Sequence, residues 1–201
     1  MPSLIQHPVI LSGEMVDLIP LVPAHFEALD RLSGDPRIWE FYSFDGSRPG
    51  KIIDVLTKAL IERDKSLQYP FTIVHKPTQT IIGSTRFLEV QPEHRKLEIG
   101  GTWLHPAYWA TAINIECKLL LLTYCFEQLK TARVQLKTDV KNTRSRKAIE
   151  KIGGQYEGCF HNDMVREDGS NRDSLYFSIV DRDWASLRPT LTALYLAKKQ
   201  G

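Results

Sequence analysis

The sequence is poor in the features that mark secreted, membrane-spanning and disulfide-bonded proteins. Only three cysteines occur among 201 residues, and no two of them are spaced as a CxxC pair. No uncharged apolar stretch is long enough to cross a bilayer, and residues 1–10 lack the basic flank and apolar centre of a signal peptide. We therefore expect a cytoplasmic protein without a membrane partner.

An excess of charge of one sign is also missing. The chain carries 26 lysines and arginines against 24 aspartates and glutamates, which leaves a formal net charge of +2. Such a balance produces no field strong enough to gather nucleic acid or an anionic membrane surface. Neither is expected as a partner.

Residues that could bind a metal are few and scattered. Cys117 and Cys125 lie at helical spacing in an apolar run, and together with Cys159 they are interpreted as buried free thiols. The six histidines show no metal-ligand spacing. The sequence therefore predicts no metal.

The chain contains no internal repeat, low-complexity tract or long Gly/Ser linker, and its length suits one domain. Apolar periodicity predicts helices at 24–32, 51–65, 113–129 and 143–152, and a last helix from about residue 182. It predicts strands at 15–21, 71–74, 81–87, 97–104, 133–138, 158–165 and 174–180. This order is typical of an α/β protein whose mixed sheet has helices on both faces.

The middle of the chain has two features that suggest a ligand site. Gly100 and Gly101 interrupt a predicted strand, which is typical of a bulge or of a close approach by a ligand. Residues 105–112 then form a short loop before a helix that begins near Ile113. The free N–H groups and dipole of such a helix start favour phosphate oxygens, although an ordinary strand-to-helix connection is the alternative.

Two segments around this loop carry a family resemblance. They are Glu98-Ile99-Gly100-Gly101-Thr102-Trp103-Leu104 before it and Asn142-Thr143-Arg144-Ser145-Arg146-Lys147-Ala148-Ile149-Glu150-Lys151-Ile152-Gly153-Gly154 after it. Residues 97–183 closely resemble the Gcn5-related N-acetyltransferases (GNAT), in the branch of the ribosomal-protein N-terminal acetyltransferases. The preceding elements fit the same fold in order.

The resemblance implies a fold and a domain organisation. It implies a GNAT fold, with a mixed and mostly antiparallel sheet of about six to seven strands that splays between the fourth and fifth strands. It also implies that residues 1–201 form one acetyltransferase domain, which ends in the helix from about residue 182.

The resemblance further implies acetyl-CoA as cosubstrate and a set of residues that bind it. The end of the splayed strand would offer backbone hydrogen bonds to the pantetheine arm, from Trp103 and Leu104. Asn142 would bond the same arm, although its place before a helix also suits an ordinary cap. The family's pyrophosphate loop maps onto Trp109, Ala110, Thr111, Ala112, Ile113 and Asn114.

Two alanines depart from the family pattern. The family usually has glycine where this chain has Ala110 and Ala112, and each added methyl would crowd a phosphate or forbid a backbone of positive φ. Alanine fits only where the residue is already helical, and a loop that winds directly into a helix meets that condition. We therefore expect negative φ at both positions and weakened rather than abolished binding.

Two residues are candidates for catalysis. Glu98 lies on the strand beside the expected acetyl group, where relatives often place the carboxylate that accepts the amine proton, and burial would raise its pKa. A structural salt bridge with the neighbouring cluster at 94–96 is the alternative. Ser145 matches a serine that some relatives use to steady or reprotonate the leaving thiolate, and a plain first-turn helix serine is its alternative.

The expected reaction is direct attack of a neutral primary amine on the thioester, with the carbonyl polarised by backbone N–H groups near Leu104. A peptide α-amine, with a reference pKa of about 7.7–8.0 against about 10.4 for lysine, is the easier acceptor to deprotonate. A protein N-terminus or a small amine is therefore favoured. The acceptor groove is expected at 39–45, 89–96 and 161–172, where Trp39, Phe41, Tyr42 and Phe44 either line it or pack in the core.

Two further interpretations share this fold. A degenerate module would bind coenzyme A weakly or not at all and serve interaction or regulation, for which the two alanines are the evidence. A small-molecule acetyltransferase, acting on a drug or an amino acid, would differ only in the acceptor pocket. The acceptor's identity and the formation of a homodimer stay open.

Overall fold

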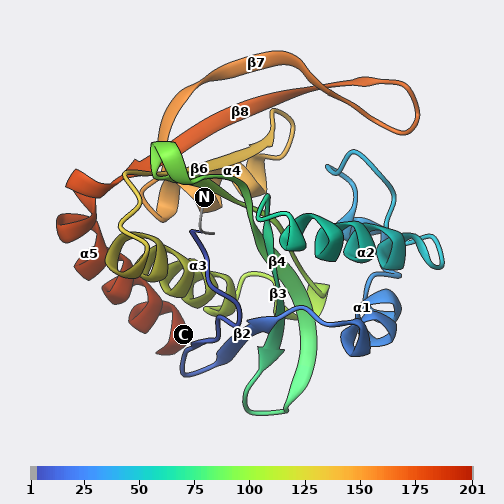
Figure 1. The fold of residues 1–201 in the computed structure, drawn as a ribbon, viewed down its shortest axis with the longest axis horizontal. Coiled ribbons are helices and arrows are strands. Elements are labelled where there is room, and N and C mark those ends of the chain that lie inside the picture. Colours follow the sequence, from blue (N-terminus) through green and yellow to red (C-terminus); the bar gives the residue numbers. More distant parts are fainter. Residues whose placement is uncertain (1–3, 201) are drawn as a thin grey trace.

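The computed structural model describes residues 4–200 and is built on one eight-stranded sheet (Figure 1). Its strands are β1 (Leu11–Ser12), β2 (Val16–Pro20), β3 (Tyr69–His75), β4 (Thr80–Gln91), β5 (Lys96–Leu104), β6 (Arg133–Asp139), β7 (Gln155–Val165) and β8 (Asn171–Val180). Their order in the sheet is β1-β2-β3-β4-β5-β6-β8-β7, and every pair is antiparallel except β5 with β6. The sheet is therefore mixed and mostly antiparallel, as predicted.

Five α-helices cover the two faces of the sheet. They are α1 (Phe26–Leu32), α2 (Lys51–Asp64), α3 (Ile113–Thr123), α4 (Thr143–Lys151) and α5 (Asp181–Gln200). Consecutive residues of a strand point to opposite faces, and at the end of β5 Trp103 packs with α1 and α2 whereas Leu104 packs with α3 and α5. Figure 1 shows the two helix pairs on opposite sides of the strands.

The predicted elements are confirmed, with three corrections. The sheet has eight strands instead of about six to seven, because β1 has two residues and leaves no periodic pattern to read. The helix expected at 113–129 is an α-helix only to Thr123 and continues as a π-helical turn at Tyr124–Gln128. Cys117 and Cys125 are buried free thiols, but Cys159 is half-exposed on β7.

The parallel pairing of β5 with β6 is very short. It joins Lys96 to Arg133, Leu97 to Val134 and Glu98 to Gln135, and both strands then continue without pairing to each other. The register between β4 and β5 shifts just beyond this point, and Gly101 there has a φ of 55°. The glycines therefore form a bulge, and the sheet splays between β5 and β6. These are the fourth and fifth of the predicted strands, at 97–104 and 133–138, because the short β1 adds one to the count.

The helix that follows the splay is tied to the edge of the sheet by a buried carboxylate. Glu116 of α3 is 3% exposed and accepts the backbone N–H groups of Glu14, Met15 and Val16 at 2.7–3.3 Å. These three N–H groups belong to the end of the β1–β2 turn and to Val16, the first residue of β2. The start of α3 is thereby fixed relative to the sheet.

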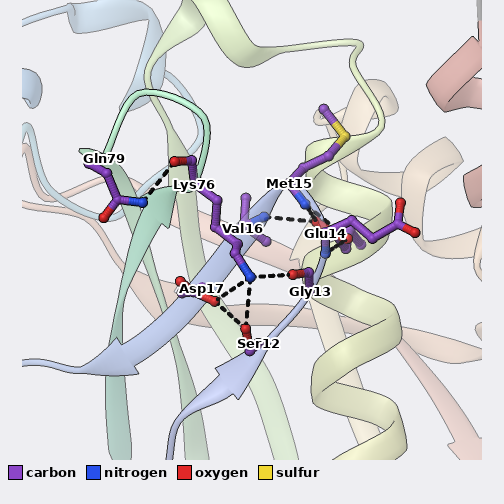
Figure 2. A network of polar contacts seen from close by, with 9 residues as sticks. Ser12, Gly13, Glu14, Met15, Val16, Asp17, Lys76 and Gln79 are labelled. Atoms are coloured by element: carbon purple, nitrogen blue, oxygen red, sulfur yellow. Dashed lines mark hydrogen bonds and ion pairs between the residues drawn. The ribbon is translucent and has the colours of Figure 1, made fainter.

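The other side of this turn is held by a lysine from the β3–β4 connection. Figure 2 shows Lys76 Nζ donating to Ser12 Oγ at 3.0 Å and to the Gly13 carbonyl at 2.8 Å, beside Asp17 at 3.5 Å. Gln79 donates to the Lys76 carbonyl at 2.8 Å.

In the part of the chain that the structure describes, no helix is long and apolar enough to cross a membrane.

Replacement of Glu116 by alanine is predicted to lower the free energy of unfolding by roughly 3 kcal/mol, because three buried N–H groups lose a charged acceptor. Chemical denaturation measures this loss. Glu150→Ala is the control, since Glu150 makes only an exposed pair with Arg146 and its loss should change stability by less than about 0.5 kcal/mol. Equal effects of the two substitutions would contradict the role of Glu116.

Candidate functional site

The backbone of Leu104 faces the gap between β5 and β6. The N–H of His105 donates to the Ile82 carbonyl at 2.9 Å, and bonded and non-bonded pairs alternate along an antiparallel ladder, so Leu104 directs its own N–H and C=O away from β4. The carbonyl of Trp103 points in the opposite direction, towards β4. Its oxygen would lie 2.1 Å from a Cβ placed on Gly83 of that strand. Of the two predicted backbone contacts, only Leu104 presents its polar groups to the gap.

The start of α3 presents a row of bare N–H groups. Within the described residues, the N–H groups of Ala110, Thr111, Ala112, Asn114 and Ile115 have no protein acceptor. Consecutive free N–H groups at the positive end of a helix form a site for an anion such as a phosphate. The predicted loop therefore has the donor set that its assigned ligand needs.

The two alanines of this loop behave differently. Ala112 has φ −70° and caps α3 in a helical conformation, as expected. Ala110 has φ +58°, so the expectation of a helical backbone there is wrong. Ala110 lies in the turn before α3, and its backbone is in the left-handed region, where alanine is disfavoured by about 1–2 kcal/mol.

Trp109 lies across the mouth of the gap. Its indole N–H donates to the Leu104 carbonyl at 2.8 Å, and the Arg144 guanidinium stacks over its ring at 4.0 Å from the centroid. Arg37 approaches the same ring at 5.9 Å. Because Trp109 follows β5 and Arg144 follows β6, this contact joins the ends of the two splayed strands.

Asn142, before the first residue of α4, caps this helix and also keeps a donor that a ligand could use. Its side-chain oxygen accepts the Ser145 N–H at 2.9 Å, so Asn142 is the cap of this helix. Its amide NH₂ has no acceptor among the described residues and stays available to a ligand. The Ser145 hydroxyl, half-buried, likewise makes no hydrogen bond within the described chain.

Glu98 sits at the closed end of the gap. It is 2% exposed, accepts a hydrogen bond from Gln135 Nε2 at 2.9 Å, and lies 3.7 Å from Lys137 Nζ. Burial raises the pKa of Glu98, and Lys137 opposes part of that rise. A Cβ on Gly100 would lie 2.6 Å from Glu98 Oε1, so that glycine makes room for the carboxylate.

Within the described residues, no ion pair joins Glu98 to the cluster at 94–96, although Lys96 lines the same cavity. His94 and Arg95 are exposed in the turn between β4 and β5, and the described ion pair of Glu98 is with Lys137 on β6. A cavity of about 260 Å³ opens onto the carboxylate. It is lined by Glu89, Gln91, Lys96, Leu97, Glu98, Gln135, Lys137 and Tyr176.

The four aromatic residues expected at the acceptor groove belong mainly to the core. Trp39 is 4% exposed and donates its indole N–H to the Ser33 carbonyl, while Tyr42 and Phe44 pack against the same ring. Phe41 is half-buried outside this cluster. Tyr42 also donates its hydroxyl to the Thr102 carbonyl at 2.8 Å, which places it beside the bulge.

The hairpin of β7 and β8 forms one edge of the sheet, and its tip lies on the side of α2 (Figure 1). At its tip the Glu167 N–H donates to the Ser43 carbonyl at 3.0 Å, and the Glu167 carboxylate pairs with Arg48 and Lys51. The segment expected at 161–172 therefore joins the segment expected at 39–45, on the acceptor side. The third expected segment, 89–96, lines the cavity at Glu98.

One group of potential metal ligands occurs among residues 4–200. Donor atoms of Cys159, His161 and Asp173 lie within 4.8 Å of one another on the β7–β8 hairpin, although sequence spacing separates them. His161 Nδ1 lies 3.0 Å from Asp173 Oδ2, and the second carboxylate oxygen accepts the Asn162 N–H. The hydrogen bonds account for this cluster, and the prediction of no metal stays a prediction.

Sequence reasoning did not single out two cations of the site. Arg144 belongs to the segment at 142–154 that carries the family resemblance, but no role was predicted for it. Its contact with Trp109 depends on the fold. Lys118 of α3 is 7% exposed and donates to Thr102 Oγ1 at 2.7 Å. Its signal in the sequence is a charge inside an otherwise apolar helix.

Comparison with known proteins gives consistent matches. Residues 16–155 match the family model of the acetyltransferase (GNAT) domain. The chain is 30% identical over 115 residues to p20 of Bacillus licheniformis, an uncharacterized N-acetyltransferase, covering 57% of this chain and 64% of p20. It is 34% identical over 91 residues to YdaF of Bacillus subtilis (strain 168), named as a proposed ribosomal N-acetyltransferase, covering 45% of this chain and 49% of YdaF. These matches span less than two thirds of either relative.

Solved structures extend the likeness to nearly the whole chain. A crystal structure of a proposed acetyltransferase superposes with a TM-score of 0.86 and 32% identity, over 98% of this chain and 99% of that one. RimJ of Mycobacterium smegmatis, in complex with CoA-disulfide, shares the fold with a TM-score of 0.76 and 20% identity, over 92% and 91% of the two chains. The resemblance found in residues 97–183 is confirmed, and the chain belongs to the GNAT acetyltransferase family.

Proposed function

We propose that the protein is an N-acetyltransferase that moves an acetyl group from acetyl-CoA to a primary amine by direct attack. The observation that carries this proposal is the gap between β5 and β6, which has bare backbone N–H groups at one end and the buried Glu98 at the other. The two ends suit the two substrates of such a transfer. Residues 1–201 are proposed to act as one acetyltransferase domain.

The acyl donor is assigned to the open end of the gap. Its pyrophosphate would accept hydrogen bonds from the loop at 110–115, and Arg144 adds a positive charge at the same mouth. Its pantetheine arm would pair with the Leu104 backbone and the free amide of Asn142. RimJ, which has the same fold, is in complex with CoA-disulfide, and this supports a coenzyme A thioester as the kind of donor.

The acceptor is assigned to the cavity at the closed end. The neutral amine would attack the thioester carbonyl, and Glu98 would take the amine proton, directly or through a water molecule. A raised pKa suits this role, because the carboxylate then holds a proton more firmly near neutral pH. The cavity carries both acidic and basic side chains, so it has no excess of acid for a polycationic drug.

A peptide α-amine or a small amine is the proposed acceptor. The α-amine loses its proton more easily than lysine, which matches a base of modest strength. The name of YdaF as a proposed ribosomal N-acetyltransferase points to a protein N-terminus. A cytoplasmic location and a homodimer remain predictions.

A binding module without turnover is the second candidate. The strained backbone at Ala110 and the position of Trp109 across the mouth of the gap are the observations that favour it. Both would weaken donor binding while leaving the fold intact. The two candidates differ in turnover.

Thermal shift and thiol release together test the proposed function. Acetyl-CoA at 100 times its Kd should raise the free energy of unfolding by about 2.7 kcal/mol. Release of free thiol with a panel of peptides and small amines should then identify an acceptor. No stabilisation at millimolar acetyl-CoA would contradict the enzyme, and stabilisation without turnover on the panel would favour the binding module.

Glu98→Gln is predicted to lower kcat by roughly 100-fold or more, because the amine proton loses its acceptor. The Kd for acetyl-CoA should stay within about threefold, since the donor binds at the other end of the gap. Wild-type kcat should also fall as pH drops through the raised pKa of Glu98, because the protonated carboxyl cannot accept a proton. Glu93→Gln, exposed in the β4–β5 turn, is the matched control. Unchanged turnover and pH profile in Glu98→Gln would exclude Glu98 as the base.

Glycine at the two alanine positions is predicted to have opposite effects. Ala110→Gly should keep or raise stability, by up to about 1 kcal/mol, and should lower the Kd for acetyl-CoA, because glycine accepts φ +58° and removes a methyl from the loop. Ala112→Gly should cost up to about 0.8 kcal/mol, since it removes the buried methyl group of Ala112. Denaturation and calorimetric titration measure both. Weaker binding in Ala110→Gly would show that the methyl does not hinder the donor.

A further inference from the structure

Lys118 is a cation inside the core of the protein. Its neighbours along α3, Cys117 and Leu121, are fully buried, and Lys118 itself is 7% exposed. The rest of this helix packs apolar residues against the sheet. A charged side chain in such a position is costly unless it is paired and hydrogen-bonded.

The hydrogen bonds of Lys118 do not offset that cost. Its ammonium has three donors, but among the described residues it makes one hydrogen bond, to Thr102 Oγ1 at 2.7 Å, and no ion pair. Thr102 Oγ1 also lies 2.7 Å from Thr85 Oγ1, so the threonine is shared. Glu116, two residues away on the same helix, is by contrast bonded to three backbone N–H groups. Hydrogen bonds therefore explain the burial of Glu116, whereas Lys118 keeps N–H donors without an acceptor among the described residues.

Lys118 contacts β5 in the part of the strand that no longer pairs with β6. Thr102 follows the Gly100–Gly101 bulge and lies beyond Glu98, the last residue of β5 that pairs with β6. Lys118 Nζ therefore reaches β5 in its splayed part, between Glu98 and the pantetheine contacts assigned to Leu104. In the proposed function this is the stretch that the thioester occupies.

We propose, resting on the proposed function, that Lys118 is the proton donor to the sulfur that leaves when the acetyl group is transferred. The amine nitrogen forms a bond to the acetyl carbon, the carbon–sulfur bond breaks, and its electron pair goes to sulfur. Lys118 gives a proton to that thiolate, while Glu98 takes one from the amine. The proton on Glu98 returns to Lys118 through solvent, so the net products are the amide and the free thiol.

The acidity of Lys118 suits this step. Burial lowers the pKa of Lys118 to about 8, and the nearby charges of Cys117 and Glu98 oppose part of the drop. These two are the titratable groups, on α3 and on β5, whose charges act on it within the described residues. A general acid works best when its pKa lies near the working pH. The Ser145 hydroxyl, the other candidate donor, is a far weaker acid.

Lys118→Met tests the proposal, because it keeps the length of the side chain and removes the proton. We expect kcat to fall by roughly 100-fold, with the Kd for acetyl-CoA within about threefold of wild type. Lys118→Arg should not restore kcat, because arginine keeps its proton. Lys58→Met, on the exposed face of α2, is the matched control and should leave kcat within about threefold of wild type.

The pH profile of kcat gives a second readout, which begins with the wild-type protein. Wild-type kcat should fall above about pH 8 as Lys118 loses its proton, and Lys118→Met should lack this basic limb. A wild-type kcat in Lys118→Met, or a wild-type profile that is flat up to pH 10, would overturn the proposal. So would a rise in Kd that accounts for the whole loss of kcat/KM, since Lys118 would then be a binding residue. If the wild-type protein turned over no amine, the proposed function itself would fail, and this step with it.

Discussion

The arrangement of this site depends on how soon the parallel ladder between β5 and β6 stops. Three residue pairs hold the two strands together, and the bulge at Gly100 and Gly101 then turns β5 away from β6. Backbone groups beyond that point, such as those of Leu104, have no neighbouring strand to pair with. Backbone groups without a partner are costly unless water or a ligand satisfies them, so the constraint that opens the sheet also leaves groups such as the Leu104 N–H available to a ligand.

The buried charges of Glu116, Lys118 and Glu98 differ in how completely other groups satisfy them. Glu116 has a full set of N–H donors and fixes α3 to the β1–β2 turn. Lys118 and Glu98 have few partners, and burial moves the pKa of each towards neutrality. Poorly satisfied buried groups lower stability, and this cost is the reason why we propose roles in proton transfer for Lys118 and Glu98. The rigid attachment of α3 by Glu116 holds Lys118 in place at the bulge.

Much of this organisation was predictable from the sequence. Periodicity located the helices and the longer strands, and the paired glycines predicted the bulge, because their conformational demands are local. The assignment of the loop at 109–114 to phosphate binding is consistent with its bare N–H groups.

The remaining features depend on contacts between distant segments. Ala110 has a left-handed backbone in the turn before α3, and alanine is not a residue type that predicts such a conformation. The stacking of Arg144 on Trp109 joins two segments that meet only after β5 and β6 splay. The two-residue strand β1 is defined only by its pairing with β2, which the sequence of two residues does not indicate. Periodicity carries no information about any of these contacts.

The most direct test of the account is where the acyl donor binds. Titration of isotope-labelled protein with coenzyme A, followed by amide chemical shifts, reports on each N–H group separately. The account predicts the largest shifts at Leu104, Thr111, Ala112, Asn114 and Ile115. Shifts confined to other parts of the chain, with these amides unmoved, would contradict it.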